Sequence, residues 1–485
     1  MIRHVLLFSA GMASLLLPVH GLAQSAEEGA GDLAQTQAAP VQATGGLRSF
    51  PPEAERSTQY GSAVAQDAQL AREEDLRRFA LPDGADITGS IDPAQDALNS
   101  PQNRRLFDNG EDAFAPTGIR RGPLTWFPAL DLAIGYDSNI DRQSDAREVA
   151  VLRLSPQLRV ESDWSRHAWN AQLRGSVEYI DDGRDLGAQL EATSELRLDL
   201  GLQTTARLRG GYTLTGETAS DPDTVAGADG TTYQNSFVAG ASVERAVGLI
   251  GATLGVEIER ALFGDTPLAD GTTQSNDDRN RIDGEMTLRL ARAAGPIYRP
   301  FVEGSVSLRH FDQSVDRNGF ERDSFGYGLR GGFIVSDDGP ISGQVSVGLV
   351  GEQFDDDRLE SVLAASAAAS LTWDVTALTS ATLDIATSLD PTTQVGSGVG
   401  INRTANLAIS HDLRRNVELR AGAGISDTQF SGIDDDTRIY TGTAGVTYRL
   451  SPVMAVRLDT TYEHEPDSAG DINRFQVEAG ITLRR

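Results

Sequence analysis

The chain has 485 residues, of which 39% are apolar, with a mean hydropathy of -0.29, no cysteine and a formal net charge of -28. No stretch beyond the first residues reaches the roughly 18 consecutive apolar residues of a spanning helix, so a bundle of membrane-spanning helices is excluded. A membrane β-barrel is not excluded, because its strands average a polar and an apolar face. The absence of cysteine fits an oxidising cell envelope. We expect no nucleic-acid partner and no cofactor.

The N-terminal residues 1–23 are predicted to be a secretory signal peptide. Arg3 precedes an apolar run at 5–17, and the small residues Gly21 and Ala23 predict cleavage near Ala23 after Sec-type export. Residues 24–124 are rich in Ala, Gln, Glu, Asp, Gly and Pro, which predicts a largely disordered periplasmic segment. Within it, 63–81 could form a short amphipathic helix that acts as a periplasmic tether, or as a plug of the lumen or a docking helix.

From residue 125 onward, polar and apolar side chains alternate with a period of two, which is the period of a β-strand. In VLRLSPQLRVESDW, residues 151–164, Arg153, Arg159 and Glu161 share one face, while Leu152 and Leu154 lie on the other. The same alternation predicts strands at 125–137, 149–162, 168–180, 188–200, 203–215, 232–245, 249–262, 279–292, 297–311, 322–336, 341–354, 359–373, 377–389, 399–412, 416–428, 436–449, 453–464 and 472–485. We therefore predict an all-β fold, a transmembrane antiparallel β-barrel of about 18 strands over residues 125–485.

The connections between these strands alternate between short and long. Short ones such as WSRH, GLQT and LRRN alternate with long ones such as GDTPLADGTTQSND, as the periplasmic turns and outer loops of a porin do. A soluble sandwich has no reason to sort its connections in this way. The expected location is the outer membrane of a Gram-negative cell, with outer-membrane lipid and lipopolysaccharide as surroundings.

Three phrases of the chain resemble a known family. GYDSNI at 135–140, LSPQLRVESDWSRHAWNAQLRG at 154–175 and TWDVTALTSATLDI at 372–385 are similar to the repeated phrases of the outer-membrane beta-barrel porin 2 family of proteobacteria. The resemblance covers about residues 125–485. It implies an outer-membrane barrel without catalytic residues, and in some members a link to capsule or exopolysaccharide systems.

The C-terminal stretch VEAGITLRR partly matches the signal that the barrel-assembly machinery recognises. Glu478, Gly480 and Leu483 fit this signal, whereas Arg485 stands where phenylalanine is usual. We therefore expect the assembly machinery as a partner.

All 42 basic residues are arginine. The alternation predicts that many of them share the lumen face with glutamates and pair along the wall, so strong anion selectivity is not expected. The predicted lumen-lining residues are Arg153, Arg159, Arg174, Arg197, Arg207, Arg209, Arg281, Arg289, Arg299, Arg309, Arg330, Glu161, Glu178, Glu195, Glu257 and Glu303.

The loop GETASDPDTVAGADGTT, residues 216–232, is a candidate constriction loop. It carries Glu217, Asp221, Asp223 and Asp229. Folded inward, these acids would face wall arginines such as Arg207, Arg209 or Arg289; the alternative is a mobile outer loop screened by salt. Acidic runs such as 355–357 are expected to be solvated loops, with divalent-cation binding among lipopolysaccharide headgroups as the alternative.

No enzyme is expected. The histidines outside the signal peptide form no metal-binding pair in the sequence, and no nucleophile motif in a strand-turn-helix context occurs, so catalytic and metal sites are expected to be absent. The predicted function is either a porin-like passive channel for small hydrophilic solutes or an exit duct associated with exopolysaccharide, with small solutes or polysaccharide as the corresponding partners. The alternative is a structural or adhesive barrel with a closed lumen.

Overall fold

The computed structural model describes residues 114–485 except 144–145, 182–186, 202, 218–222, 225–227, 229, 294–296, 336–338, 435 and 467–469. The predicted signal peptide 1–23 and the candidate helix at 63–81 lie outside the described residues. Within them, no helix is long and apolar enough to cross a membrane. The described residues begin eleven positions before the predicted start of the barrel at 125, and a short strand, β1 (Ile119–Arg121), pairs there with β2 (Leu124–Asp137).

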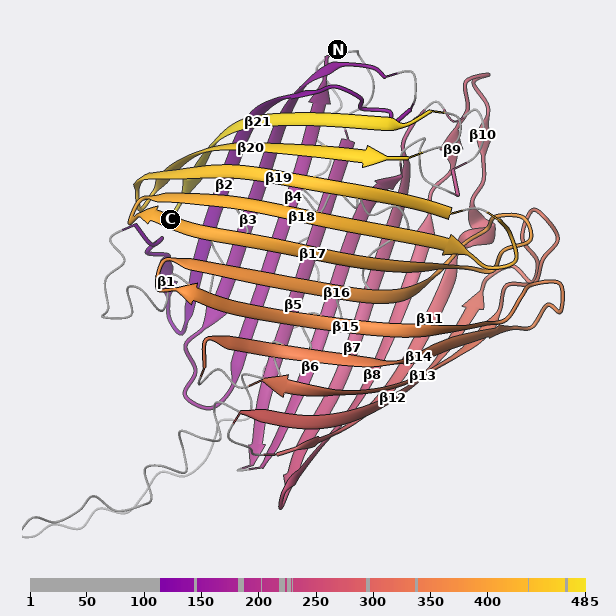
Figure 1. Ribbon diagram of the computed structural model, residues 1–485, viewed down its shortest axis with the longest axis horizontal. Helices are drawn as coiled ribbons and strands as arrows, with labels where there is room; N and C mark the ends of the chain where they lie inside the picture. The colour runs from indigo at the N-terminus through magenta and orange to yellow at the C-terminus, as the bar shows by residue number, and fades with distance from the viewer. Residues whose placement is uncertain are drawn as a thin grey trace, which may run out of the picture. The chain divides into compact units, whose positions relative to one another are not determined.

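Eighteen antiparallel strands form a closed barrel, which confirms the predicted fold class (Figure 1). After β2 they are β3 (Val149–Ser162), β4 (Ala168–Ile180), β5 (Gly187–Gly201), β6 (Thr204–Glu217), β7 (Thr232–Val247), β8 (Ile250–Phe263), β11 (Arg281–Arg292), β12 (Tyr298–Phe311), β13 (Ser324–Val335), β14 (Ile341–Phe354), β15 (Val362–Thr376), β16 (Thr379–Pro391), β17 (Val399–Arg414), β18 (Val417–Phe430), β19 (Asp436–Ser451), β20 (Met454–Glu465) and β21 (Ile472–Arg484). Each pairs with its neighbours along the chain, and the pairing of β2 with β21 closes the barrel.

The strands are steeply tilted. Figure 1 shows those of the C-terminal half crossing those of the N-terminal half at a large angle, as tilted strands do on opposite walls of a barrel. The predicted strands agree with the observed ones to within about three residues at their ends. One such difference matters below: the strand predicted at 279–292 begins at Arg281, and Arg279 instead lies in a 3-10 turn, η2 (Asp277–Arg279).

The connections at one end of the barrel have at most five residues, and most of those at the other end are longer. The short ones are 163–167, 202–203, 248–249, 293–297, 336–340, 377–378, 415–416 and 452–453. In the turn between β7 and β8, Gly248 has φ +61°, a conformation that two-residue hairpin turns require and that glycine adopts without strain. The long connections lie at the other end, where β9 (Thr266–Pro267) and β10 (Thr273–Gln274) form a small hairpin between β8 and β11.

The wall is apolar outside and polar inside. Large apolar side chains in the middle of the strands are exposed, among them Leu132, Val256, Leu288, Leu349, Leu407 and Leu458. Most of their neighbours in the sequence are buried or partly buried, and Arg, Glu, Asp, Ser and Thr are frequent among them. Exposed tyrosine, tryptophan and phenylalanine side chains stand near both ends of this apolar surface, including Tyr136, Tyr179, Phe325, Tyr440, Tyr298, Phe333, Trp373 and Tyr448. An apolar outer surface between two belts of aromatic side chains is typical of a barrel that spans a lipid bilayer.

Candidate functional site: the barrel interior and its outer mouth

The sequence-predicted arginines lie among acids along the wall, in ion pairs either between adjacent strands or, as for Arg159 with Glu161, within one strand. Arg207 is 1% exposed and lies 3.2 Å from Glu244 of β7. Arg209, two residues further along β6, donates to Glu195 of β5 at 2.7 Å, and Glu195 also lies 3.9 Å from Arg207. The pairs follow from the register, because β6 sets Arg209 opposite Glu195. Opposite charges on adjacent strands can reach each other without bending the wall.

The other predicted arginines lie in similar surroundings. Their observed partners are Glu178 and Glu478 for Arg153, Glu161 for Arg159, Glu191 for Arg174, Asp199 for Arg197, Asp283 for Arg281, Glu303 for Arg289 and Arg330, and Asp283 and Glu352 for Arg309, while Arg299 is buried. Three of them also stack on phenylalanine rings: Arg159 on Phe127, Arg281 on Phe263 and Arg289 on Phe301. Such pairing neutralises most of the arginine charge, so the basic residues do not form an uninterrupted cationic surface.

Glu257 is in different surroundings. The register of β8 and β11 places it directly opposite Glu285, and Glu259 lies two residues along the same strand, opposite Asp283. Like charges directly opposite each other are unfavourable unless cations lie nearby. This part of the wall is therefore acid-rich.

A cluster of charges joins the last strands to the first one. Arg457 of β20 donates to both oxygens of Asp131 on β2, at 2.6 and 3.2 Å, and to Asp459 at 2.9 Å. It also pairs with Glu478 of β21, and Asp131 accepts a further hydrogen bond from Thr482. Asp131 is only 2% exposed. We call this cluster the closure seam, because its members come from both ends of the barrel sequence.

At the long-connection end, two of the four acids of the candidate constriction loop are described: Glu217 and Asp223. Asp221 and Asp229 lie outside the described residues. The ion pairs of both described acids are made with Arg279, which donates to both oxygens of Glu217 at 2.8 and 2.6 Å and lies 3.9 Å from Asp223. The predicted partners were wall arginines; the observed one belongs to η2 and stacks on Phe263 at 4.1 Å. Sequence reasoning missed Arg279 because it was assigned to a strand.

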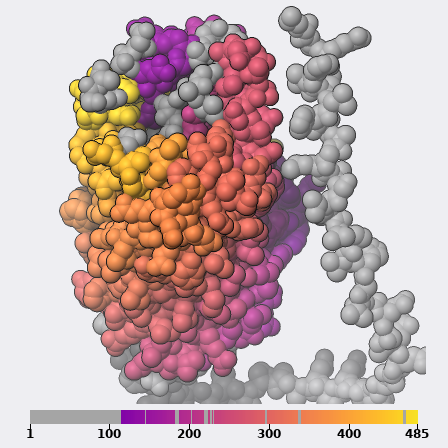
Figure 2. Space-filling model, turned by 90° about the vertical axis from the view of Figure 1, so that its right-hand side faces the viewer, coloured from indigo at the N-terminus to yellow at the C-terminus, as the bar shows by residue number. Residues whose placement is uncertain are grey.

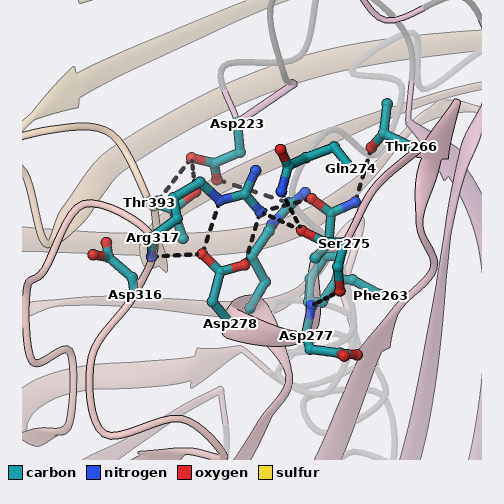
Figure 3. Close-up of polar contacts among 12 residues, drawn as sticks. Asp223, Phe263, Thr266, Gln274, Ser275, Asp277, Asp278, Asp316, Arg317 and Thr393 are labelled. Atoms are coloured by element: carbon teal, nitrogen blue, oxygen red, sulfur yellow. Dashed lines mark hydrogen bonds and ion pairs between the residues drawn. The ribbon is translucent and has the colours of Figure 1, made fainter. Parts of the chain in front are cut away.

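Asp223 also reaches the connection between β16 and β17. Its carboxylate accepts hydrogen bonds from the backbone and side chain of Thr393, at 2.7 and 3.0 Å (Figure 3). It also accepts one from the side chain of Thr392 at 2.8 Å. Around the barrel, β8 and β11–β15 lie between the two connections on one side, and β18–β21 and β2–β5 lie between them on the other. The contact therefore crosses the mouth at this end.

Further contacts join the connections that follow β8, β12 and β16. Arg317 donates to both oxygens of Asp278 at 2.8 and 2.7 Å and to Asn276 at 2.7 Å (Figure 3). Arg322, only 3% exposed, donates to Asp316 and to three backbone carbonyl groups of the connection between β16 and β17. Figure 2, which looks from the right-hand side of Figure 1, shows the surface hollowed at its upper end, between the segments coloured indigo, yellow and rose. We call the contacts of Arg279, Arg317, Arg322 and Asp223 the mouth network.

The sequence signal for this network is a local alternation of acids with arginine and asparagine. Both NDDRNR at 276–281 and DRNGFERD at 316–323 contain it. A search for such runs in the long connections and at the adjoining strand ends could have found Arg279, Arg317 and Arg322. Within the described part of the chain, no three histidine, aspartate or glutamate side chains are grouped so that they could hold a metal ion.

The mouth network is expected to withstand mild acid. Burial raises the pKa of Asp278, but the hydrogen bonds from the side chain and backbone of Arg317 outweigh burial and hold the pKa below its ordinary value. A carboxyl group whose pKa is lowered on folding stabilises the folded state above its unfolded pKa of about 3.9 and loses this contribution as the pH falls further. Protection of the Arg317 amide from hydrogen exchange, corrected for intrinsic rates, should therefore be constant from pH 7 to pH 5 and fall below about pH 4.

The control for that experiment is Asp278→Asn. This variant removes the carboxyl group that titrates, so the Arg317 amide should be less protected at pH 7. Its protection should also no longer decrease below about pH 4, because no Asp278 carboxylate remains to be protonated. A steep loss of protection in the original protein between pH 7 and pH 5 would contradict the assignment.

Comparison with known proteins identifies the family. The model of the family described as "Putative beta-barrel porin 2" matches residues 112–485, which include the whole barrel. The chain belongs to this family. The match confirms the resemblance drawn from the repeated phrases, and with the apolar outer surface it makes the chain an outer-membrane β-barrel of the porin-2 family. The long connections of this porin-2 barrel therefore lie at its outer, extracellular end.

Solved structures offer more distant similarities. The ferric enterobactin receptor of Pseudomonas aeruginosa matches with a TM-score of 0.38 at 8% identity, over 74% of the porin-2 chain and 81% of the receptor. The FrpB iron transporter of Neisseria meningitidis matches with a TM-score of 0.41 at 7% identity, over 72% and 62% of the two chains. The outer membrane transporter YddB of Escherichia coli matches with a TM-score of 0.35 at 11% identity, over 72% and 60%. No curated protein matches the chain.

Proposed function

We propose that this barrel is a porin-like passive channel for small hydrophilic solutes, narrowed at its outer mouth by the connection between β6 and β7. The observation that carries the proposal is the set of hydrogen bonds from Thr392 and Thr393 to Asp223 across the mouth. Barrels of sixteen to eighteen strands are wide enough for an aqueous channel. A loop tied across such a mouth reduces the cross-section through which solutes pass.

The wall also suggests a charge preference. Strands β14, β15 and β16 contain no arginine, and β15 and β16 carry Asp374, Asp384 and Asp390. Acidic side chains lining a pore favour cations. Since most arginines elsewhere in the described wall pair with acids, we expect a weak preference for cations over anions.

Deleting residues 219–230 is expected to increase the current through the channel. The deletion removes Asp223 and with it the contact across the mouth, so the constriction widens. The measurement is single-channel conductance in a planar bilayer, together with the reversal potential in a potassium chloride gradient. The original protein should conduct with a weak cation preference, and the shortened one should conduct more with a changed reversal potential.

Two point variants make the comparison sharper. Asp223→Ala should raise the conductance in the same direction as the deletion, because it removes the acceptor of all three hydrogen bonds. Asp270→Ala removes the same charge from the same end of the barrel, but the hydrogen bonds from Thr272 to Asp270 stay within the β9–β10 hairpin. It should leave the current unchanged.

The outcome also separates the alternatives. A protein that inserts but passes no current would support the structural or adhesive barrel with a closed lumen, and equal currents before and after deletion would refute the constriction. The link to exopolysaccharide, which the family resemblance implies, stays a prediction. Conduction of oligosaccharides of increasing length through the shortened variant would address it.

A further inference from the structure

The outside of the barrel carries few charged side chains, and their positions are informative. In the described strands, the outward-facing positions are apolar over most of their length, as for Ile401, Leu407 and Ile409 on β17. Near the outer end, two groups of arginine and aspartate side chains lie on this surface. One is Arg260 of β8 with Asp312, and the other is a row across β17, β18 and β19 formed by Arg403, Asp427 and Arg438.

The register places this row on the lipid-facing side. Arg403 lies opposite Asp427, and Asp427 lies opposite Arg438. Tyr440, two residues beyond Arg438, is exposed on the same face, whereas Ser426, the sequence neighbour of Asp427, is buried on the other. The row thus borders the apolar surface, where the outer leaflet would meet the barrel.

The row has more positive than negative charge. Arg438 donates to one oxygen of Asp427 from two nitrogens, at 2.9 and 2.6 Å. A single nitrogen of Arg403 lies 3.5 Å from the other oxygen and 2.8 Å from the amide oxygen of Gln429. One carboxylate is shared by two guanidinium groups, so the row carries one excess positive charge. Its arginine side chains remain 38% and 46% exposed.

We propose that Arg403 and Arg438 bind a phosphate group of a glycolipid in the outer leaflet. A guanidinium group matches the oxygens of a phosphate with paired N–H donors, and two such groups around one anion combine charge with fixed geometry. Further toward the middle of the barrel, the outward residues of β18 and β19 are small, including Ala423 and Gly442, and leave space for an acyl chain beside the wall. This space is compatible with a bound glycolipid, but the proposal is argued from the two arginines.

The other outward charges serve as a matched comparison. Arg260 donates to both oxygens of Asp312, at 2.7 and 2.5 Å, so one guanidinium group is matched by one carboxylate. This pair has no excess charge. The exposed Asp436 lies two residues from Arg438 toward the outer end of β19, opposite Gln429 in the register. The proposal depends on outer-membrane residence and not on the channel function.

The test measures binding of lipid A to the purified full-length barrel in detergent micelles by native mass spectrometry. The original protein should bind lipid A that carries both phosphates and should bind dephosphorylated lipid A at least tenfold more weakly. The double variant Arg403→Gln with Arg438→Gln should lose this difference by binding both forms weakly. Arg260→Gln should bind like the original protein.

Equal affinity of the original protein and the double variant for lipid A would overturn the proposal, as would equal affinity of the original protein for the two forms of lipid A. The proposal would also be overturned if the original protein is a dimer and the double variant is a monomer without bound lipid. In that case the row would join two copies of the chain. Heat-dependent gel mobility checks folding. If the glutamine variant does not fold, Arg403→Lys with Arg438→Lys replaces it: the charge stays, the paired donors are lost, and binding should be weaker than in the original protein.

Discussion

Replacing Arg457 by methionine is expected to destabilise the barrel by about 3 to 5 kcal/mol, the usual cost of removing one partner from a buried ion pair. Methionine retains much of the apolar stem, so the loss is mainly electrostatic. Asp131, Asp459 and Glu478 would be left close together at the closure seam without the cation that they share. The free energy of unfolding can be measured by urea titration in lipid vesicles, with tryptophan fluorescence as the signal.

Two further variants test the reason for this loss. Adding Asp131→Asn to the methionine variant removes one of the stranded charges and should recover part of the stability. Arg120→Ala breaks the exposed pair with Asp163 and should cost no more than about 1 kcal/mol. A methionine variant as stable as the original protein would show that the seam does not hold the first and last strands together.

Leu407→Arg is expected to cost about 2 to 4 kcal/mol, because it places a charge near the middle of the lipid-facing surface. Leu407 lies at the centre of β17 and is 42% exposed on the outside of the wall. The free energy of unfolding in vesicles of defined thickness measures the effect, and a thinner bilayer should reduce it.

The matched control lies one residue away. Asn406 is exposed on the opposite face of β17 and lies opposite Asp384 in the register with β16. Arginine at this position meets water and a neighbouring carboxylate, so Asn406→Arg should cost far less than Leu407→Arg. Equal losses from the two variants would contradict the assignment of the two faces.

The closed barrel could be predicted from the sequence because its signals are local. Side chains alternate across a strand with a period of two, so Leu407 and Asn406 are assigned to opposite faces from their neighbours alone. The length of each connection is equally local, and together these signals predicted all eighteen strands with ends correct to about three residues. Because the alternation does not mark where a strand begins, the strand predicted from 279 began two residues too early, and Arg279 was assigned to it.

The partners of the charged residues could not be predicted in this way, because they depend on which strands become neighbours. Arg457 and Asp131 are 326 positions apart and meet where the barrel closes, and Asp223 meets Thr393 across the mouth from 170 positions away. The sequence by itself determined the membrane barrel, its two faces and its supply of arginines and acids. The tertiary structure decided which of these charges neutralise each other, which connections cross the mouth, and that Arg403 and Arg438 share one carboxylate on the lipid side. Strand register and barrel closure bring these groups together, and neither leaves a local pattern in the chain.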